Sequence, residues 1–226
     1  MLKLARSIRD NKVALDSSDT GTGKTVMSLT IAEDLGLTPF VLCPKSVVPS
    51  WREHGEKMGV LTIVNNYEKL RTGRTEYVKK KGQRFDWYLD RDRVLLVFDE
   101  VHRCKGSKSL QSKLLAAAKR QGFKILMLSA TAFQDPTEMR AIGYALNLHD
   151  YKGWWNWCRY NGCKQGDFGG MKFNGSERIL SDLHASIYFG EVPMGSRISI
   201  KDLPKGSYPD KLITAEGNSV ADISIE

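Results

Sequence analysis

The stretch "LDSSDTGTGKT", from Leu15 to Thr25, decides how the rest of the chain is interpreted. It differs by one residue from the phosphate-loop pattern G-x-x-x-x-G-K-[ST], because Ser18 stands where the first glycine would be. The apolar segment "KVALD" (12–16) predicts a buried strand before it, and the apolar residues Val26, Leu29, Ile31, Ala32 and Leu35 predict a helix after it. That context favours a true phosphate loop over a flexible turn at a helix N-terminus.

The loop predicts a site for ATP and Mg²⁺. The backbone amides at the start of the following helix are expected to cradle phosphates. The Lys24 ammonium would reach the β- and γ-phosphates, and the Thr25 hydroxyl would hold Mg²⁺. The expected nucleotide-binding residues are Ser18, Asp19, Thr20, Gly21, Thr22, Gly23, Lys24 and Thr25.

An acidic pair at the end of the most apolar segment supplies the second half of such a site. "RVLLVFDE" (93–100) is a continuous apolar run, which is typical of a strand covered on both faces. Asp99 would bind Mg²⁺, and Glu100 would orient and polarise the attacking water, so Lys24, Asp99 and Glu100 form the expected catalytic set. A pair of acids at a strand end can also serve only as a helix cap, but the upstream loop favours catalysis.

Strands and helices alternate along the first two thirds of the chain. Apolar runs at 40–44, 60–65 and 124–131 predict further strands, and helical patterns lie between several of them and at 137–148. The fold class expected is therefore α/β, with a mostly parallel sheet covered by helices on both faces. Residues 1–148 are expected to form this unit, and residues 149–226 to form an aromatic-rich, mixed extension or the start of a linker.

Five segments carry a family resemblance. "SDTGTGKT", "DEVH" and "SAT" resemble motifs I, II and III of the superfamily 2 (DEAD/DEAH-type) helicases and translocases, and the similarity is greatest to the Swi/Snf-like branch. "VLCPKSVVPSW" (41–51) resembles motif Ia of that branch and "VNNYEKL" (64–70) its motif Ib. Ala132 stands where a proline commonly follows motif III. The resemblance covers 10–148 well, the remainder only weakly, and implies an N-terminal RecA-like ATPase lobe.

The resemblance also assigns residues. It implies that His102, Ser129, Ala130 and Thr131 couple the γ-phosphate to nucleic acid, and that Lys45 and Ser46 contact its backbone. The alternative for the coupling residues is structural, a histidine cap and an ordinary strand end. Tyr67 is expected to pack beneath this surface. The family's loop often lacks the opening glycine, so Ser18 is a small-residue variant.

The function expected from the resemblance is the first lobe of an ATP-dependent DNA helicase or translocase. An RNA helicase lobe, and a nucleotide-dependent nucleic-acid-binding module without motor activity, stay open. A P-loop kinase is disfavoured by the "DEVH" and "SAT" pair. No Q-x-x-G-R-x-x-R pattern occurs, so a second RecA-like lobe with its arginine finger is expected in cis or in trans. Without it, we expect nucleotide binding with only weak hydrolysis.

Composition is consistent with a polyanionic partner. Lysine and arginine total 34 against 26 acids, a net charge of +8, although a merely solvated basic surface has the same signature. "KKKGQR" and "HRCKGSK" are expected to be exposed basic runs, the second of which could also line a nucleic-acid groove. No apolar run approaches the roughly 18 residues that cross a bilayer, and the charged N-terminus does not resemble a signal peptide. The expected location is intracellular: cytoplasmic, nuclear, or in the host cell of a virus.

Two residue clusters are less specific. Four cysteines are too sparse for a disulfide scaffold, and Cys158 and Cys163 are expected to be ordinary thiols because they form an incomplete zinc-ligand set. Trp154, Trp155 and Trp157 cannot all face one side of a helix, so packing is favoured over base stacking.

Overall fold

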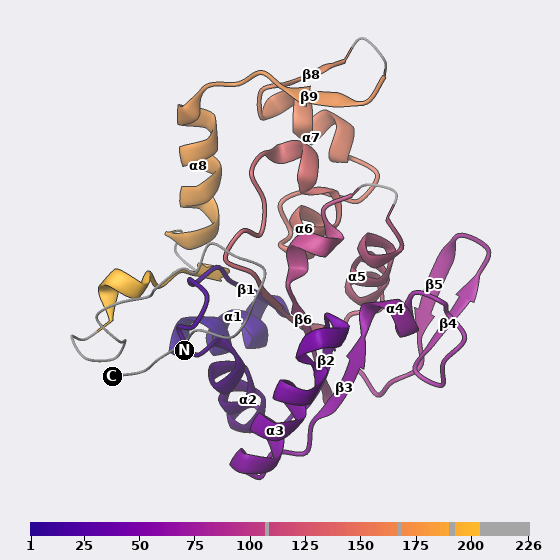
Figure 1. The fold of residues 1–226 in the computed structure, drawn as a ribbon. Coiled ribbons are helices and arrows are strands. Elements are labelled where there is room, and N and C mark those ends of the chain that lie inside the picture. The colour runs from indigo at the N-terminus through magenta and orange to yellow at the C-terminus, as the bar shows by residue number, and fades with distance from the viewer. Residues whose placement is uncertain (107–108, 167–168, 190–192, 204–226) are drawn as a thin grey trace, which may run out of the picture.

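A six-stranded parallel sheet forms the centre of the computed structural model, which describes residues 1–106, 109–166, 169–189 and 193–203. The strand order is β10-β1-β7-β6-β2-β3 (Figure 1). The strands of this sheet are β1 Val13–Asp16, β2 Thr38–Cys43, β3 Ile63–Asn66, β6 Val94–Asp99, β7 Lys124–Leu128 and β10 Gly195–Ser196. The α/β class with a parallel sheet, expected from the alternating pattern, is confirmed.

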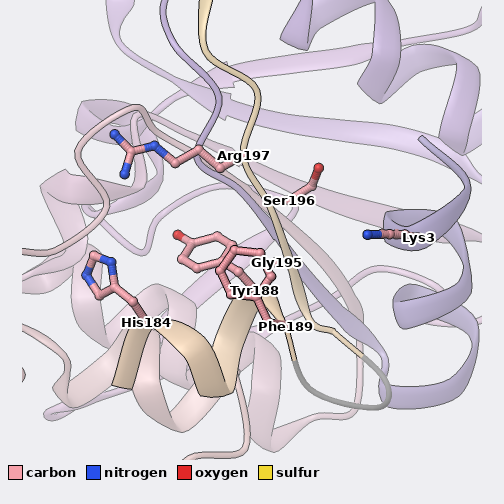
Figure 2. A pocket seen from close by; sticks show the side chains of 7 residues that line it. All are labelled: Lys3, His184, Tyr188, Phe189, Gly195, Ser196 and Arg197. Carbon is pink, nitrogen blue, oxygen red and sulfur yellow. The ribbon is translucent and has the colours of Figure 1, made fainter. Parts of the chain in front are cut away.

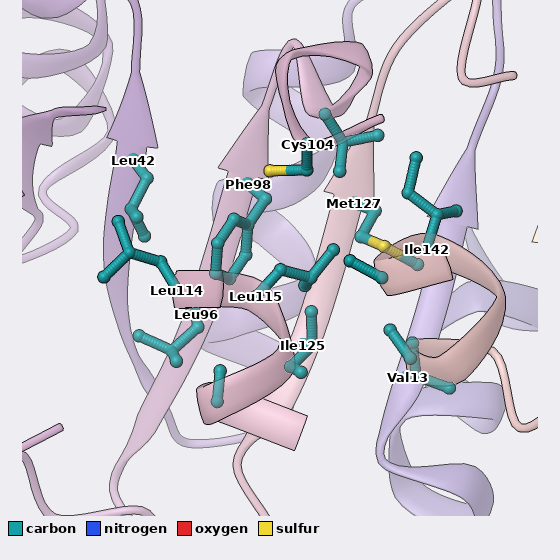
Figure 3. Packing of buried hydrophobic residues seen from close by; sticks show 14 of the residues in the cluster. Val13, Leu42, Leu96, Phe98, Cys104, Leu114, Leu115, Ile125, Met127 and Ile142 are labelled. Carbon is teal, nitrogen blue, oxygen red and sulfur yellow. The ribbon is translucent and has the colours of Figure 1, made fainter. Parts of the chain in front are cut away.

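Helices cover both faces of this sheet. Their bounds are α1 Leu2–Asn11, α2 Lys24–Asp34, α3 Val48–Met58, α4 Tyr67–Leu70, α5 Leu110–Arg120, α6 Arg140–Ala145, α7 Trp154–Tyr160 and α8 Glu177–Tyr188. Alternate residues of β6 divide between the faces: Leu95 and Val97 pack with α1, α2 and α3, whereas Leu96 and Phe98 pack with α5 and α6 (Figure 3). Burial on both sides explains why this strand is apolar throughout.

The register brings the ends of three strands to one edge. Leu128 of β7 pairs with Asp16 of β1 on one side and with Asp99 of β6 on the other. The segments that follow these strands therefore leave the sheet side by side. In open α/β sheets, ligands bind at this carboxyl edge.

Two β-hairpins stand outside the main sheet, β4 Val78–Lys81 with β5 Arg84–Trp87 and β8 Cys163–Gln165 with β9 Met171–Phe173. The lysines of the first are exposed, as expected for a basic excursion. The hairpin itself was not predicted, and it is anchored because Phe85 and Trp87 are buried against the core.

Local pattern misjudged several details. Val26 is 45% exposed, because the helical repeat places it on the side of α2 away from Ala32. The strand expected at 60–65 begins only at Ile63, since the Val60 N–H donates to the Gly55 carbonyl and closes the end of α3. The helix expected at 137–148 is a 3₁₀ turn, Pro136–Glu138, followed by the short α6.

The segment after residue 148 includes both surface and core. Trp154 is buried and Trp155 is 43% exposed, so packing holds for the first and not for the second. The strand β10 pairs with β1 in the main sheet. The proposed division of the chain near residue 148 stays a prediction. Within the described residues, no helix is long and apolar enough to cross a membrane.

Candidate nucleotide site

The glycine loop connects β1 to α2 at the carboxyl edge of the sheet. Gly21 and Gly23 have φ of 86° and 85°, a region where side chains are strained. A Cβ on Gly23 would meet nothing within 4 Å, so the backbone conformation alone accounts for glycine there. The helix α2 begins at Lys24 without a side-chain cap, which leaves its first backbone N–H groups facing the loop. All of the predicted nucleotide-binding residues lie in this loop and the first turn.

The Lys24 ammonium lies against the loop. It donates to the carbonyl oxygens of Ser18 and Asp19, each at 2.8 Å. Its positive charge also helps to lower the pKa of the Asp99 carboxyl group, against the larger effect of burial. The structure therefore brings the loop lysine and the acid of the second motif into one electrostatic environment.

Ser18 contributes more than small size. It is buried, and its hydroxyl donates to Asp16 Oδ1 and accepts a hydrogen bond from the Ile198 N–H at 3.0 Å. Asp16 Oδ1 also accepts from the Ser18 N–H at 2.9 Å. A glycine here would remove the hydroxyl and both of its hydrogen bonds.

Asp19 ties the loop to the segment after β10. Its Oδ2 accepts from Ser199 Oγ at 3.0 Å and from the Ile200 N–H at 3.1 Å, and its own N–H donates to the Ile198 carbonyl at 3.0 Å. The Ile200 and Ser199 hydrogen bonds hold the Asp19 pKa below its usual value. These contacts were not predicted, because the sequence assigned this segment to an extension.

A small cavity lies beside this junction. Its volume is about 230 Å³, and its lining includes Lys3 of α1, Tyr188 of α8 and Arg197 (Figure 2). The hydroxyls of Ser17 and Tyr188 share a hydrogen bond of 2.6 Å, which fixes the end of α8 against the start of the loop.

Both Asp99 oxygens are held at the end of β6. Oδ2 accepts from the Trp51 indole N–H at 2.8 Å, and Oδ1 accepts from the Glu100 N–H at 3.0 Å. Burial raises the pKa of the carboxyl group, and the Trp51 hydrogen bond opposes that rise. The Tyr67 hydroxyl donates to the Asp99 carbonyl at 2.8 Å, so the buried Tyr67 packs as expected. Trp51 was quoted within motif Ia, but its contact with Asp99 was not predicted.

Glu100 and His102 connect the second motif to the third. Glu100 has φ 52°, an unusual conformation for a residue with a side chain, and it aims the carboxylate back toward His102. His102 Nδ1 lies 3.1 Å from Glu100 Oε2 and 3.1 Å from Ser129 Oγ. Ser129 Oγ in turn accepts from the Thr131 N–H at 3.3 Å. The residues expected to couple the motifs are thus in direct contact.

Lys45 and Ser46 lie apart from this network. They begin the 3₁₀ helix Lys45–Val47, which follows β2 at the same edge of the sheet, and both are exposed. Cys158 and Cys163 are buried free thiols, and the described residues contain no group of three potential metal ligands. The prediction of ordinary thiols is consistent with this arrangement.

Comparison with known proteins places the fold. No family model matches the chain. It is 32% identical over 159 residues to a mimivirus (Acanthamoeba polyphaga mimivirus) protein named "Putative ATP-dependent RNA helicase L364", over 60% of this chain and 30% of that protein. The chain thus spans under a third of the length of this curated relative.

Two solved structures resemble it. The SWI2/SNF2 ATPase core of Sulfolobus solfataricus, in complex with double-stranded DNA, superposes with a TM-score of 0.61 at 18% identity, over 89% of this chain and 44% of that one. The Hef helicase domain of Pyrococcus furiosus gives a TM-score of 0.47 at 20% identity, over 65% of this chain and 35% of that one. The first likeness establishes a RecA-like α/β fold.

Proposed function

This chain is a superfamily 2 helicase-like lobe, and we propose that it binds Mg-ATP at residues 18–25 and couples ATP hydrolysis to nucleic-acid binding or movement. The observation that carries the proposal is the hydrogen-bonded connection from Glu100 through His102 to Ser129. It joins the acidic strand end to the third motif at the edge where the loop also lies.

The chain's own groups divide the chemistry. Lys24 would neutralise phosphate charge once its ammonium turns from the Ser18 and Asp19 carbonyls. Glu100 would orient and deprotonate the attacking water. His102 and Ser129 would sense the position of Glu100 and transmit it. Phosphoryl transfer depends mainly on such positioning and charge neutralisation.

The residues present suit a hard cation. The Thr25 hydroxyl and the Asp99 carboxylate are oxygen ligands of the kind that Mg²⁺ prefers. Trp51 and Glu100 each donate to one Asp99 oxygen, and a carboxylate oxygen retains a further lone pair for water or metal. When bound, Mg²⁺ would neutralise developing charge on the phosphates.

The proposed nucleic-acid contacts are Lys45 and Ser46, which are exposed at the same edge of the sheet. The resemblance of motifs Ia and Ib to the Swi/Snf-like branch favours DNA. A second candidate is an RNA helicase lobe, which the printed name of the mimivirus relative favours. ATPase stimulation by duplex DNA, single-stranded DNA and RNA, measured side by side, discriminates the two.

We further propose that a second RecA-like lobe, in cis or in trans, completes the ATP site. An arginine supplied to such a site contributes about 10³ to 10⁵ in rate. This chain by itself should therefore bind Mg-ATP and hydrolyse it slowly.

Two substitutions test the ATP site. Lys24→Ala should abolish binding of a fluorescent ATP analogue, because it removes the phosphate-facing charge. Glu100→Gln should retain binding and lose phosphate release, because the amide cannot accept a proton. Lys57→Ala removes an exposed lysine of α3 and serves as the control. Unchanged nucleotide binding in Lys24→Ala would refute the site, and fast turnover by the chain alone would refute the need for a second lobe.

A further inference from the structure

A basic groove lies on the outer side of α5, between the β4–β5 hairpin and the segment after α6. Its volume is about 610 Å³. Five cationic side chains line it: Arg84, Lys113, Arg120, Arg140 and Lys152. Three aromatic side chains join them, Phe85, Tyr144 and Tyr151. The described residues that line the groove include no carboxylate.

The floor of the basic groove is one face of α5. Lys113, Ala116 and Arg120 recur at the spacing that aligns side chains along a helix, while Leu114 and Leu115 point into the core. Ala116 has the smallest side chain of the three and leaves the groove open between two cations. The helix thus uses its inner face for stability and presents its outer face to solvent.

Hydrogen bonds fix the hairpin wall against α5. Arg120 Nη2 donates to the Phe85 carbonyl at 2.7 Å and lies 3.3 Å from Asp86 Oδ1, so part of its charge is neutralised. Lys113 Nζ donates to Gln83 Oε1 at 2.6 Å. Gln83 is neutral, so the Lys113 charge still faces the basic groove. The wall is therefore built before any ligand arrives, which lowers the entropic cost of binding.

The opposite wall is aromatic. The rings of Tyr144 and Tyr151 lie 5.4 Å apart at 66°, and the Arg140 guanidinium carbon lies 4.7 Å from the centroid of the Tyr151 ring. Both tyrosines are partly exposed. Exposed aromatic rings beside cations are the pairing that single-stranded nucleic acid uses, with bases stacked on rings and phosphates held by charge.

We propose that the basic groove binds a segment of single-stranded nucleic acid. Arg84, Lys113 and Lys152 contact its phosphates, and bases stack on Tyr151 and Tyr144. An acidic peptide would satisfy the charges but would leave the tyrosine rings without a matching partner. The site goes beyond the proposed function, because its lining includes neither an ATP-site residue nor Lys45 and Ser46.

The charge contribution is tested with fluorescein-labelled dT20 and rU20, without nucleotide, by fluorescence anisotropy over a salt series. Arg84→Gln combined with Lys152→Gln should weaken binding several-fold and flatten the salt dependence by about 0.7 per lost phosphate contact. The matched control is Lys164→Gln with Lys172→Gln, a cross-strand pair of exposed lysines on the β8–β9 hairpin with the same change of charge. Equal weakening in both double variants would overturn the proposal.

The stacking contribution is tested at Tyr151. Tyr151→Leu should weaken dT20 binding by about fivefold or more and leave an abasic oligonucleotide unaffected, whereas Tyr151→Phe should bind dT20 like the parent chain. Thermal unfolding of each variant verifies its fold. Equal binding of dT20 by the leucine variant, or competition by polyglutamate with the same Tyr151 dependence, would overturn the assignment to nucleic acid.

The two oligonucleotides separate DNA from RNA as the source of the strand. The same variants are also titrated with the fluorescent ATP analogue. A chain that fails to bind ATP but binds dT20 through Tyr151 would refute the proposed function and leave the basic groove standing. The reverse result would refute the basic groove alone.

Discussion

At the residue scale, the candidate site depends on side chains that hold other side chains. Ser18 occupies a position where the loop pattern asks only for a small residue, yet its hydroxyl joins Asp16 to Ile198. Trp51 holds a carboxylate oxygen that the proposed metal site requires. Both act by fixing geometry, which is what phosphoryl transfer most needs from a protein.

Trp51 should set the acidic limit of metal-dependent ATP binding. Its indole N–H favours the ionised form of Asp99, so Trp51→Phe should raise the Asp99 pKa further above its usual value. Protons then compete with Mg²⁺ at higher pH, and the acidic limb of Mg-ATP binding should move to higher pH. Fluorescence titrations across pH measure the shift.

The control for this titration is Trp155→Phe, which changes an exposed tryptophan of α7. It should leave the acidic limb in place. If Trp51→Phe folds normally and shows the same limb as the parent chain, the indole does not position the metal-binding carboxylate.

At the scale of elements, the short strand β10 is held to the sheet chiefly by the residues on its C-terminal side. Only Gly195 and Ser196 pair with β1, but Ile198, Ser199 and Ile200 then hydrogen-bond to the glycine loop. A two-residue strand contributes little by itself, so the loop and the returning segment stabilise each other.

Asp19→Ala should therefore loosen this segment. It removes the acceptor of the Ser199 and Ile200 hydrogen bonds, so backbone N–H exchange across 195–200 should accelerate. Because the folded pKa is lowered, the contribution of Asp19 is complete above its ordinary value of about 3.9 and is lost as pH falls through the folded value. Hydrogen exchange measured by mass spectrometry reads the change directly.

Asp182→Ala provides the comparison, since it removes an exposed carboxylate on α8 that pairs with Arg178. Exchange across 195–200 should stay unchanged in that variant. Equal exchange in Asp19→Ala and the parent chain would show that the Asp19 side chain does not hold the segment.

At the scale of the whole molecule, one sheet serves two surfaces. Its carboxyl edge carries the candidate ATP site, while α5, which covers one face, turns its outer side to the basic groove. The net charge of +8 is consistent with a polyanion at either surface and does not say which.

Binding of Mg-ATP should stabilise the entire lobe, because the loop, β6 and β7 belong to one sheet. At a concentration 100 times Kd, a ligand adds about 2.7 kcal/mol to the free energy of unfolding. For a chain of 226 residues this corresponds to a rise in Tm of about 5–10 °C. Differential scanning fluorimetry measures it, Lys24→Ala should show no rise, and an equal rise in that variant would place the nucleotide elsewhere.

Local pattern was enough for the elements that form the sheet centre. The apolar runs before the loop, at 93–100 and at 124–131 predicted β1, β6 and β7, because a strand buried on both faces must be apolar throughout. The order of loop, acidic pair and "SAT" then predicted that the three would meet at one edge. The individual roles of these residues stay predictions.

Only the tertiary structure decided which distant residues hold the site. Trp51 and Asp99 are 48 positions apart, and Asp19 and Ser199 are 180 apart. The basic groove likewise combines a hairpin, a helix and a later turn. Periodicity reports whether a side chain faces water or the core, but strand order and the return path of the chain determine its neighbour. The sequence by itself therefore determined the loop and the sheet, and folding decided what supports them.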